Sequence, residues 1–282
     1  MQQIAFVTDK NQPKINESDV LLARELERRG NVVVAAPWDK NCNWGKFDTI
    51  ILRSCWNYHK QYFEFLHWLR VLEQLHIPIW NSIPTIRWNS HKSYLLDLQK
   101  RGVRIPPTKL VPKNHSVRLE SFLPWEIAVI KPAVGASAVN VMRIEKSNVK
   151  KYEKQFQNML TQGDVIIQKY IEEIELNGEV SIIFFGNTLS HAVIKRPKYG
   201  GFLASSDFGG TEALFHPTKS LVAQAKNILD LIEENVLYAR VDGIVVGEKL
   251  VLMELELIEP LLFVDLFPVS ARLFAQMFLL QT

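Results

Sequence analysis

Residues 250–260 (LVLMELELIEP) place two acidic side chains, Glu254 and Glu256, two residues apart in an otherwise apolar stretch that ends at Glu259-Pro260. The alternation predicts a β-strand, because side chains two residues apart lie on one face of a strand. Glu254 and Glu256 therefore share a face, about 7 Å apart. The other face takes the apolar residues Val251, Met253, Leu255 and Leu257. Adjacent carboxylates repel each other and are costly to bury, so a divalent cation between them is one explanation and an edge strand with a wet face is the other.

A second strand is predicted at residues 238–246 (YARVDGIVV), joined to the first by a short turn. If the turn has two residues, Asp242 lies opposite Met253, which sets a charge against an apolar side chain. If the loop has three residues, Val246 pairs with Leu250 and the acidic residues of both strands share a face. Cross-strand matching and burial of one apolar face favour the three-residue loop, which is common in hairpins.

The favoured register places Asp242 opposite Glu254 and Arg240 opposite Glu256. Three carboxylates and one guanidinium then lie on a single patch. Magnesium is usually held by carboxylates that share it with the phosphate groups of a substrate. The patch therefore predicts a site for a metal ion and a phosphate rather than a solvated edge.

The rest of the composition narrows the class of protein. The 282 residues are 47 % hydrophobic but contain no apolar run of transmembrane length, so a membrane partner is not expected. The first ten residues lack the basic and long apolar regions of a signal peptide. Two cysteines, Cys42 and Cys55, provide neither a disulfide framework nor a metal-binding spacing, which fits the cytoplasm. The net charge of +3 is small and the basic residues are dispersed, which argues against nucleic acid as a partner.

Residues 1–87 alternate between strand and helix patterns, which predicts a small α/β domain with a parallel sheet. We expect strands at residues 4–7, 32–36, 47–52 and 77–80, and helices at residues 18–29 (capped by Ser18) and 62–76. Ligands of such sheets bind beyond the carboxyl ends of the strands. Arg53, Trp56 and Tyr58 follow the third strand there and are candidates for binding a substrate carboxylate. A surface loop held by Trp56 is the alternative.

Two lysines mark the next part of the chain. Lys92 falls in the first turn of a helix expected at residues 89–102, where a cation opposes the helix dipole, although a solvated lysine explains it equally well. Lys131 ends a strand expected at residues 126–131. The small residues at 133–141 let backbone amides approach a phosphate, but ordinary turns use the same residues.

The following segments are a strand over residues 139–144, a helix over residues 147–161, a strand over residues 164–171, and a hairpin over residues 178–195 that turns at Gly186-Asn187. His191 lies within the second hairpin strand and is expected to be structural. Residues 198–216 form a loop long enough to predict a lid. A helix over residues 217–235 leads into the acidic hairpin.

The order of these parts, from about Trp80 to Pro268, resembles the ATP-grasp superfamily. The resemblance implies an α/β fold in which an N-terminal parallel α/β domain precedes two α+β lobes that clamp a nucleotide. The corresponding domains are residues 1–87, 88–170 and 171–282, the last with the metal site. Within the superfamily, the chain is similar to glutathione-synthetase-like and ribosomal-protein-modifying ligases. The runs RSCWNYH, WNSHKSYLLDL, HAVIKRP and MELELIEP resemble most the O-ureido-serine cyclo-ligase type of cycloserine biosynthesis.

The resemblance also implies roles for individual residues. It implies nucleotide contacts through the phosphate-binding lysines, the small-residue loop, the adenine-binding hinge strand and an acid at the ribose, here Lys92, Lys131, Ser137, Gln168, Lys169, Tyr170, Ile171 and Glu179. One or two Mg²⁺ ions, or Mn²⁺, would bind Asp242, Glu254 and Glu256. Arg240, with Lys195 or Arg196, would stabilise the transferred phosphoryl group. Glu256 stands where asparagine is often found, and the arginines that glutathione synthetases use are absent, which argues against glutathione as substrate.

The implied activity is that of an ATP-dependent carboxylate–amine ligase, or of an intramolecular cyclo-ligase. Such an enzyme phosphorylates the carboxylate of a small amino-acid-like substrate, an amine attacks the acyl phosphate, and ADP and phosphate leave. A small-molecule kinase, a non-catalytic nucleotide-binding protein and a purely structural α/β protein are the alternatives. The identity of the acid and the amine, and the oligomeric state (a homodimer included), do not follow from the sequence.

Overall fold

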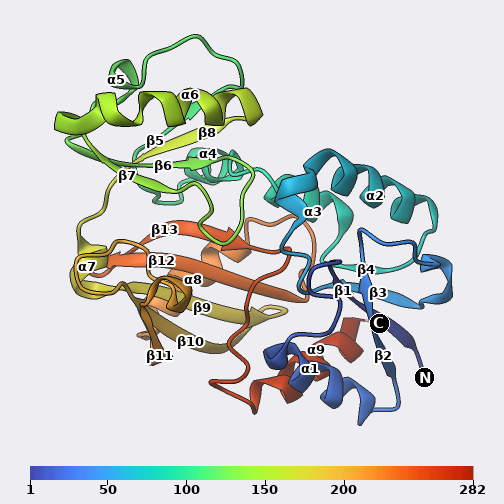
Figure 1. Ribbon diagram of the computed structural model, residues 1–282. Coiled ribbons are helices and arrows are strands. Elements are labelled where there is room, and N and C mark those ends of the chain that lie inside the picture. The colour runs from blue at the N-terminus through green and yellow to red at the C-terminus, as the bar shows by residue number, and fades with distance from the viewer. Residues whose placement is uncertain (282) are drawn as a thin grey trace.

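The computed structural model describes residues 1–281, and this part of the chain folds around three β-sheets (Figure 1). The first sheet is parallel, with strand order β2-β1-β3-β4, and its strands are β1 (Gln3–Thr8), β2 (Val32–Pro37), β3 (Thr49–Leu52) and β4 (Ile79–Trp80). Helix α1 (Glu17–Glu27) packs on one face and helix α2 (Tyr62–Gln74) on the other. Short 3₁₀ turns, η1 (Trp44–Lys46) and η2 (Tyr58–Gln61), complete the domain. The expected N-terminal parallel α/β domain is confirmed.

The start of helix α1 differs from the expectation. Its N-cap is Asn16, whose Oδ1 accepts a hydrogen bond of 2.9 Å from Asp19 N. Ser18 was expected there, but its Oγ accepts from Val264 N instead, at 3.1 Å. Both residue types cap helices well. A contact with the far end of the chain therefore decides which of them does so.

The helix expected at residues 89–102 begins five residues later, as α4 (Tyr94–Lys100), and a helix that was not expected, α3 (Ile83–Asn89), precedes it. Ser82 caps α3, and Asn89 ends it, because the Asn89 amide donates to Leu255 O at 2.8 Å and accepts from Leu257 N at 3.0 Å. The prediction that Lys92 lies in the first turn of a helix is therefore wrong. Lys92 lies in the turn between the two helices.

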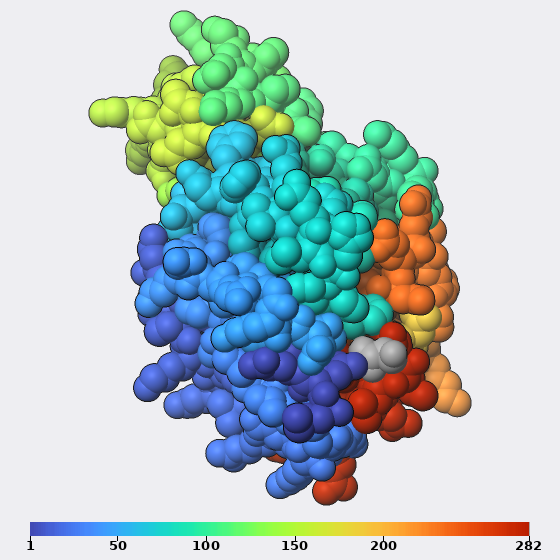
Figure 2. Space-filling view, turned by 90° about the vertical axis from the view of Figure 1, so that its right-hand side faces the viewer, coloured from blue at the N-terminus to red at the C-terminus, as the bar shows by residue number. Residues whose placement is uncertain are grey.

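The central lobe is an antiparallel sheet with strand order β5-β8-β6-β7, made of β5 (Thr108–Val111), β8 (Val165–Lys169), β6 (Ile127–Pro132) and β7 (Met142–Glu145). Its outer face is covered by α5 (Leu119–Phe122), η3 (Lys146–Tyr152) and α6 (Glu153–Gln162). The helix expected at residues 147–161 thus begins as a 3₁₀ turn. Figure 2 shows this lobe, in green, projecting from the rest of the molecule.

The third sheet is antiparallel, with strand order β11-β10-β9-β12-β13. Its elements and neighbours are α7 (Glu173–Asn177), β9 (Glu179–Phe185), β10 (Thr188–Arg196), η4 (Ser206–Phe208), β11 (Thr211–Phe215), α8 (Lys219–Leu229), β12 (Tyr238–Val246), β13 (Lys249–Glu256) and α9 (Ser270–Gln281). The expected hairpin about Gly186-Asn187 is confirmed, because Phe185 pairs with Thr188. The expected lid is shorter than its 19 residues, since its end forms the edge strand β11.

The β12–β13 hairpin reaches the expected register by a different route. Asp242 pairs with Glu254, and Arg240 pairs with Glu256, as predicted. The three-residue loop is wrong, however: Val246 pairs with Lys249 across a two-residue turn. Gly243 pairs with Leu252, so Met253 is an extra residue, a β-bulge, between the two halves of the ladder.

The bulge changes which residues of β13 face the core. Leu250, Leu252, Leu255 and Leu257 all lie in the cluster beneath the sheet, against α4 and α8. Met253 was expected on that face, but it packs with Tyr170 and Ile244 on the opposite side. A bulge shifts the alternation by one residue, so leucines spaced by two, three and two residues can face the same core.

The remaining face of this sheet is shared between a core and a polar cleft. Ile183, Phe185 and Tyr238 pack with helices α1 and α9 against the N-terminal sheet. Tyr238 also donates from its hydroxyl to Leu52 O at 2.6 Å, which ties the two sheets together.

Among the described helices, none has the length and apolar character needed to cross a membrane.

Candidate active site

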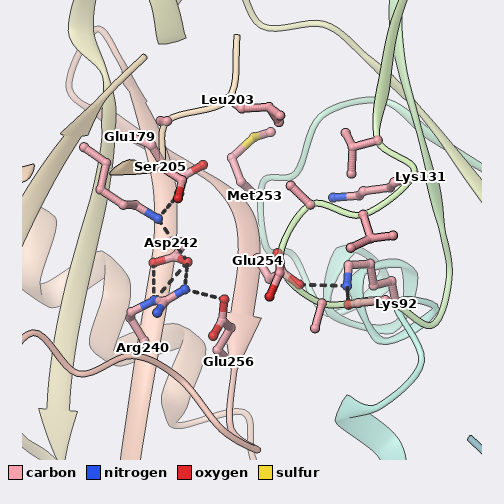
Figure 3. Close-up of a pocket in the computed structure, with 18 of the residues that line it drawn as sticks. Lys92, Lys131, Glu179, Leu203, Ser205, Arg240, Asp242, Met253, Glu254 and Glu256 are labelled. Atoms are coloured by element: carbon pink, nitrogen blue, oxygen red, sulfur yellow. Dashed lines mark hydrogen bonds and ion pairs between the residues drawn. The ribbon is translucent and has the colours of Figure 1, made fainter. Parts of the chain in front are cut away.

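A cavity of about 560 Å³ lies between the central lobe and the cleft side of the third sheet (Figure 3). It is lined by nearly all of the side chains that the sequence singled out: Trp56, Tyr58, Lys92, Lys131, Ser137, Gln168, Lys169, Tyr170, Ile171, Glu179, Lys195, Arg240, Asp242, Glu254 and Glu256. These residues come from all three parts of the chain. The fold therefore gathers into one place groups that are up to 200 residues apart.

Arg240 is the centre of a buried ion-pair network on β12. Its Nε lies 3.0 Å from Asp242 Oδ1 and its Nη2 lies 2.9 Å from Asp242 Oδ2. The same Nη2 contacts Glu256 of β13, and Nη1 donates to Leu261 O at 2.8 Å. Burial opposes the ionisation of Asp242, but Arg240 and Lys195 outweigh it and lower the pKa of Asp242 to about 2. At Glu256 burial prevails and raises the pKa to about 7, although Arg240 opposes it.

Lys195 joins one further acid, Glu179, to this network. Its ammonium contacts Glu179 and lies 3.5 Å from Asp242 Oδ2. Ser181 donates from its hydroxyl to Asp242 Oδ1 at 2.6 Å. Asp242 is thus held by three side chains from β9, β10 and β12.

Lys92 connects the small-residue loop to the acidic hairpin. Its Nζ lies 2.9 Å from Glu254 Oε1 and donates to Gly135 O at 2.7 Å, as Figure 3 shows in part. Its backbone N–H also donates to Ala133 O at 2.7 Å. The pKa of Glu254 is lowered because Lys92 and then Lys131 outweigh the effect of burial.

Lys131 is a buried cation with no counterion of its own. No carboxylate of residues 1–281 lies within 4.0 Å of its ammonium, and only 8 % of the residue is exposed. Burial lowers its pKa to about 8, although Glu254 and Glu179 partly oppose this and Lys92 adds to it. A group in this state is stabilised by an anion in the cavity.

The end of the cavity between the lobes suits a flat, partly polar ligand. Gln168 is 1 % exposed; its amide nitrogen donates to Thr108 Oγ1 at 3.0 Å, and its Oε1 is buried without a hydrogen-bond partner. Such an acceptor costs free energy until a donor meets it. The walls here are apolar and consist of Val129, Ile171, Phe202, Ile244 and Met253.

Two of the expected site residues lie elsewhere. Arg53 is 1 % exposed, and its Nη2 binds Asp19 Oδ1 at 2.9 Å and Pro260 O at 2.8 Å. It joins helix α1 to the segment after β13, so the prediction that it binds a substrate carboxylate is corrected. Arg196 is exposed and lies outside the cavity lining, because neighbouring residues of a strand point to opposite faces and Lys195 takes the inner one.

Other cavity residues were missed. Gln12, Glu259 and Phe263 line the end nearest the N-terminal domain, and Met253 lines the apolar end between the lobes. The bulge that brings Met253 there could have been read from the leucine spacing of residues 250–257. Gln12 carried no signal, because it stands in a polar loop.

The carboxylates are of the chemical type that binds magnesium, but their side chains do not converge on one point. Asp242, Glu254 and Glu256 supply the oxygen donors that Mg²⁺ prefers, from paired positions on one face. Among the described residues, no three His, Cys, Asp or Glu side chains converge closely enough to hold a metal ion. The reason is that each carboxylate contacts an arginine or lysine of the protein instead.

Two antiparallel lobes that enclose a cavity with lysines above it and acids on the β12–β13 hairpin define an ATP-grasp enzyme. Residues 97–265 match the family model of the prokaryotic glutathione synthetase ATP-grasp domain, and the chain belongs to this family. Residues 4–81 match the N-terminal domain of the D-cycloserine synthetase DcsG. The chain is an ATP-dependent ligase that forms carbon–nitrogen bonds.

Particular relatives agree with this assignment. The cycloserine biosynthesis protein DcsG of Streptomyces lavendulae is 28 % identical over 200 residues, which are 68 % of this chain and 67 % of that protein. The crystal structure of D-cycloserine synthetase DcsG is similar with a TM-score of 0.89 and 24 % identity, covering 99 % of both chains. A D-alanine–D-alanine ligase from Bacillus anthracis has a TM-score of 0.72 and 15 % identity, covering 99 % of this chain and 96 % of that one.

Proposed function

We propose that this ligase activates the carboxylate of a small amino-acid-like substrate as an acyl phosphate, which an amine then attacks. ADP and phosphate are the other products. The observation that carries the proposal is the uncompensated ammonium of Lys131, which shares a cavity with the acids of the β12–β13 hairpin. A triphosphate satisfies both, because its anionic oxygens meet the lysine and share a cation with the acids.

The nucleotide would lie between the lobes. Its adenine would occupy the apolar end, where a donor on the base meets Gln168 Oε1. Residues 168–171 would form the hinge around it, and Glu179 would bind the ribose hydroxyls. Lys92, Lys131 and the loop that carries Ser137 would contact the phosphates.

The magnesium site is part of the proposal. Asp242, Glu254 and Glu256 would hold one or two Mg²⁺ ions, or Mn²⁺, once the nucleotide provides the remaining ligands. The metal would neutralise charge on the phosphoryl group as a Lewis acid. Lys92 would then exchange Glu254 for phosphate oxygens.

The chain's own residues would do the rest of the chemistry. Arg240 and Lys195, both 7 % exposed, would stabilise the charge of the transferred phosphoryl group and of the oxyanion that follows. The loop over residues 202–212 lines the cavity and would exclude water from the acyl phosphate. No covalent enzyme intermediate is needed.

The proposal extends to the organisation of the chain. Residues 1–87 would bind substrate, residues 88–170 would cover the nucleotide, and residues 171–282 would carry the metal site. The likeness to DcsG supports an intramolecular reaction, in which the acid and the amine belong to one molecule. ATP and small amino acids as substrates fit a cytoplasmic location.

A trapping experiment tests the activity. The protein is incubated with Mg·ATP and a panel of amino acids in the presence of hydroxylamine, which converts an acyl phosphate to a hydroxamate. A ligase yields hydroxamate and ADP in equal amounts. A stable phosphorylated product without hydroxamate would identify a small-molecule kinase instead.

A further inference from the structure

Residues 258–261 form a segment whose backbone is held in place by four different side chains. The carbonyl oxygens of residues 259–261 accept hydrogen bonds in turn from Trp56 (3.0 Å), Arg53 (2.8 Å) and Arg240 (2.8 Å). Ile258 O lies 2.8 Å from the Tyr238 hydroxyl, whose one proton it shares with Leu52 O. The donors come from two parts of the chain, the loop after β3 and strand β12. Such a network holds the segment rigidly at the junction of the N-terminal domain and the third sheet.

This segment presents one side chain to the cavity that the nucleotide chemistry does not use. Glu259 lines the cavity, and no lysine, arginine or histidine among residues 1–281 lies within 4.0 Å of its carboxylate. It differs in this respect from Asp242, Glu254 and Glu256, each of which has a cationic partner. Burial, and after it the nearby charge of Glu256, raise the pKa of Glu259 to about 8, so a cationic ligand beside it would favour the ionised form.

The surroundings of Glu259 favour an organic ammonium group as that cation. Trp56, Tyr58 and Phe263 line the same end of the cavity, and aromatic rings attract ammonium groups through their faces. Gln12, also from the N-terminal domain, adds a polar group beside them.

We infer that Glu259, with Trp56 and Tyr58, binds the α-ammonium group of the substrate and selects amino acids over other carboxylic acids. This inference rests on the proposed function, because it places the substrate carboxylate near Arg240. Arg240 donates to the carbonyl of Leu261, two residues from Glu259, and both charged side chains line the same cavity. In this assignment the substrate's two charged groups meet these two residues, and the ammonium group serves for recognition while another amine is the nucleophile.

Hydroxamate formation tests the inference, because hydroxylamine replaces the attacking amine and the substrate ammonium is then needed only for binding. The probes are alanine, serine and glutamate in both enantiomers, each paired with its 2-hydroxy acid (lactate, glycerate and 2-hydroxyglutarate). We expect the wild-type kcat/KM of the best amino acid to exceed that of its hydroxy acid by about tenfold to a hundredfold. In Glu259→Gln the preference should fall below about threefold.

A matched variant and a binding measurement make the outcome decisive. Glu120→Gln, at an exposed site on α5 away from the cavity, should keep the full preference. Mg·ADP should raise the melting temperature of Glu259→Gln as it does that of the wild type. Two results would overturn the assignment of Glu259. One is a Glu259→Gln variant that still prefers the amino acid, and the other is a wild type with equal kcat/KM for each amino acid and its 2-hydroxy acid.

The wild-type comparison needs no variant, so it stands even if Glu259→Gln does not fold. A wild type that binds Mg·ADP but none of the six amino acids better than its hydroxy acid also counts against Glu259. Failure to bind Mg·ADP at all would instead contradict the proposed function.

Discussion

The ammonium of Lys92 lies 2.9 Å from Glu254 Oε1, so a lysine that precedes the central lobe is paired with an acid of the C-terminal sheet. The same ammonium donates to Gly135 O in the small-residue loop. Lys92 thus links the cover of the cavity to the strand beneath it. In the proposed function, a nucleotide with its metal would replace this link, and the contact would then couple ligand binding to the position of the loop.

Glu254→Gln should abolish Mg·ATP turnover, with a loss of at least about a hundredfold in kcat, because an amide cannot replace a carboxylate that shares a cation with phosphate. Glu248→Gln, at the exposed turn of the same hairpin, is the matched control and should be fully active. The measurement is ADP release, together with a denaturant melt to show that both variants unfold cooperatively. An unchanged rate in Glu254→Gln would remove the metal assignment.

Arg240→Met should lower the free energy of unfolding by about 3–5 kcal/mol, because it leaves buried carboxylates without their partner. Asp242 and Glu256 both lose the guanidinium that offsets their burial. Arg28→Met, at an arginine side chain that is 72 % exposed, should cost less than about 1 kcal/mol. Urea titration of the two variants measures the difference, and equal losses would contradict the buried network.

Lys131 should take up a proton when ADP binds at a pH near its pKa of about 8. Phosphate favours the charged ammonium, so uptake approaches one proton above that pH and vanishes about two units below it. Calorimetric titrations in buffers of different ionisation enthalpy measure the uptake. Lys131→Arg keeps the positive charge at every pH and should bind ADP without proton uptake. Proton uptake that persists in this variant would assign the proton to another group.

The same pKa has a consequence for stability. Because the pKa of Lys131 in the folded protein lies below its ordinary value, the folded state binds fewer protons than the unfolded state between pH about 8 and about 10.5. The unfavourable contribution of this lysine is therefore complete below that range and disappears as the pH rises through it.

Gly243→Ala should lower the free energy of unfolding by about 1–3 kcal/mol through overpacking. A Cβ at Gly243 would lie 2.6 Å from Leu250 Cδ1 and 2.9 Å from Val251 O, next to the bulge at Met253. Gly163→Ala is the control, since a Cβ there meets nothing within 4 Å. Denaturant unfolding compares the two, and a neutral Gly243→Ala would mean that the hairpin adjusts at no cost.

In the β12–β13 hairpin, the local sequence pattern predicts the strand register correctly but not the length of the turn. Burial of one apolar face was enough to predict that Asp242 lies opposite Glu254, and the structure has this pairing. The predicted length of the turn was wrong because, without a bulge, this register requires a three-residue loop. The bulge at Met253 separates them, since it lets a two-residue turn coexist with the register that buries Leu250, Leu252 and Leu255.

The long-range contacts could not be predicted from local pattern. Arg53 follows a strand at an edge where ligands bind, but its partners, Asp19 and Pro260, are 34 and 207 residues away. Asn89 ends helix α3 at the position where the sequence pattern predicts a helix to begin, and its amide binds the backbone of Leu255 and Leu257. Neither partner is visible in the neighbouring sequence.

The sequence by itself determined the α/β domain and the acidic patch of the hairpin, because strand alternation and charge placement are local properties of the chain. The order of parts and most of the cavity-lining residues followed from the resemblance to the ATP-grasp superfamily. Only the tertiary structure decided which cations face which carboxylates and that Glu259 faces none. The reason is that ion pairing depends on which strands and loops meet at the cavity, and this follows from packing across the whole chain.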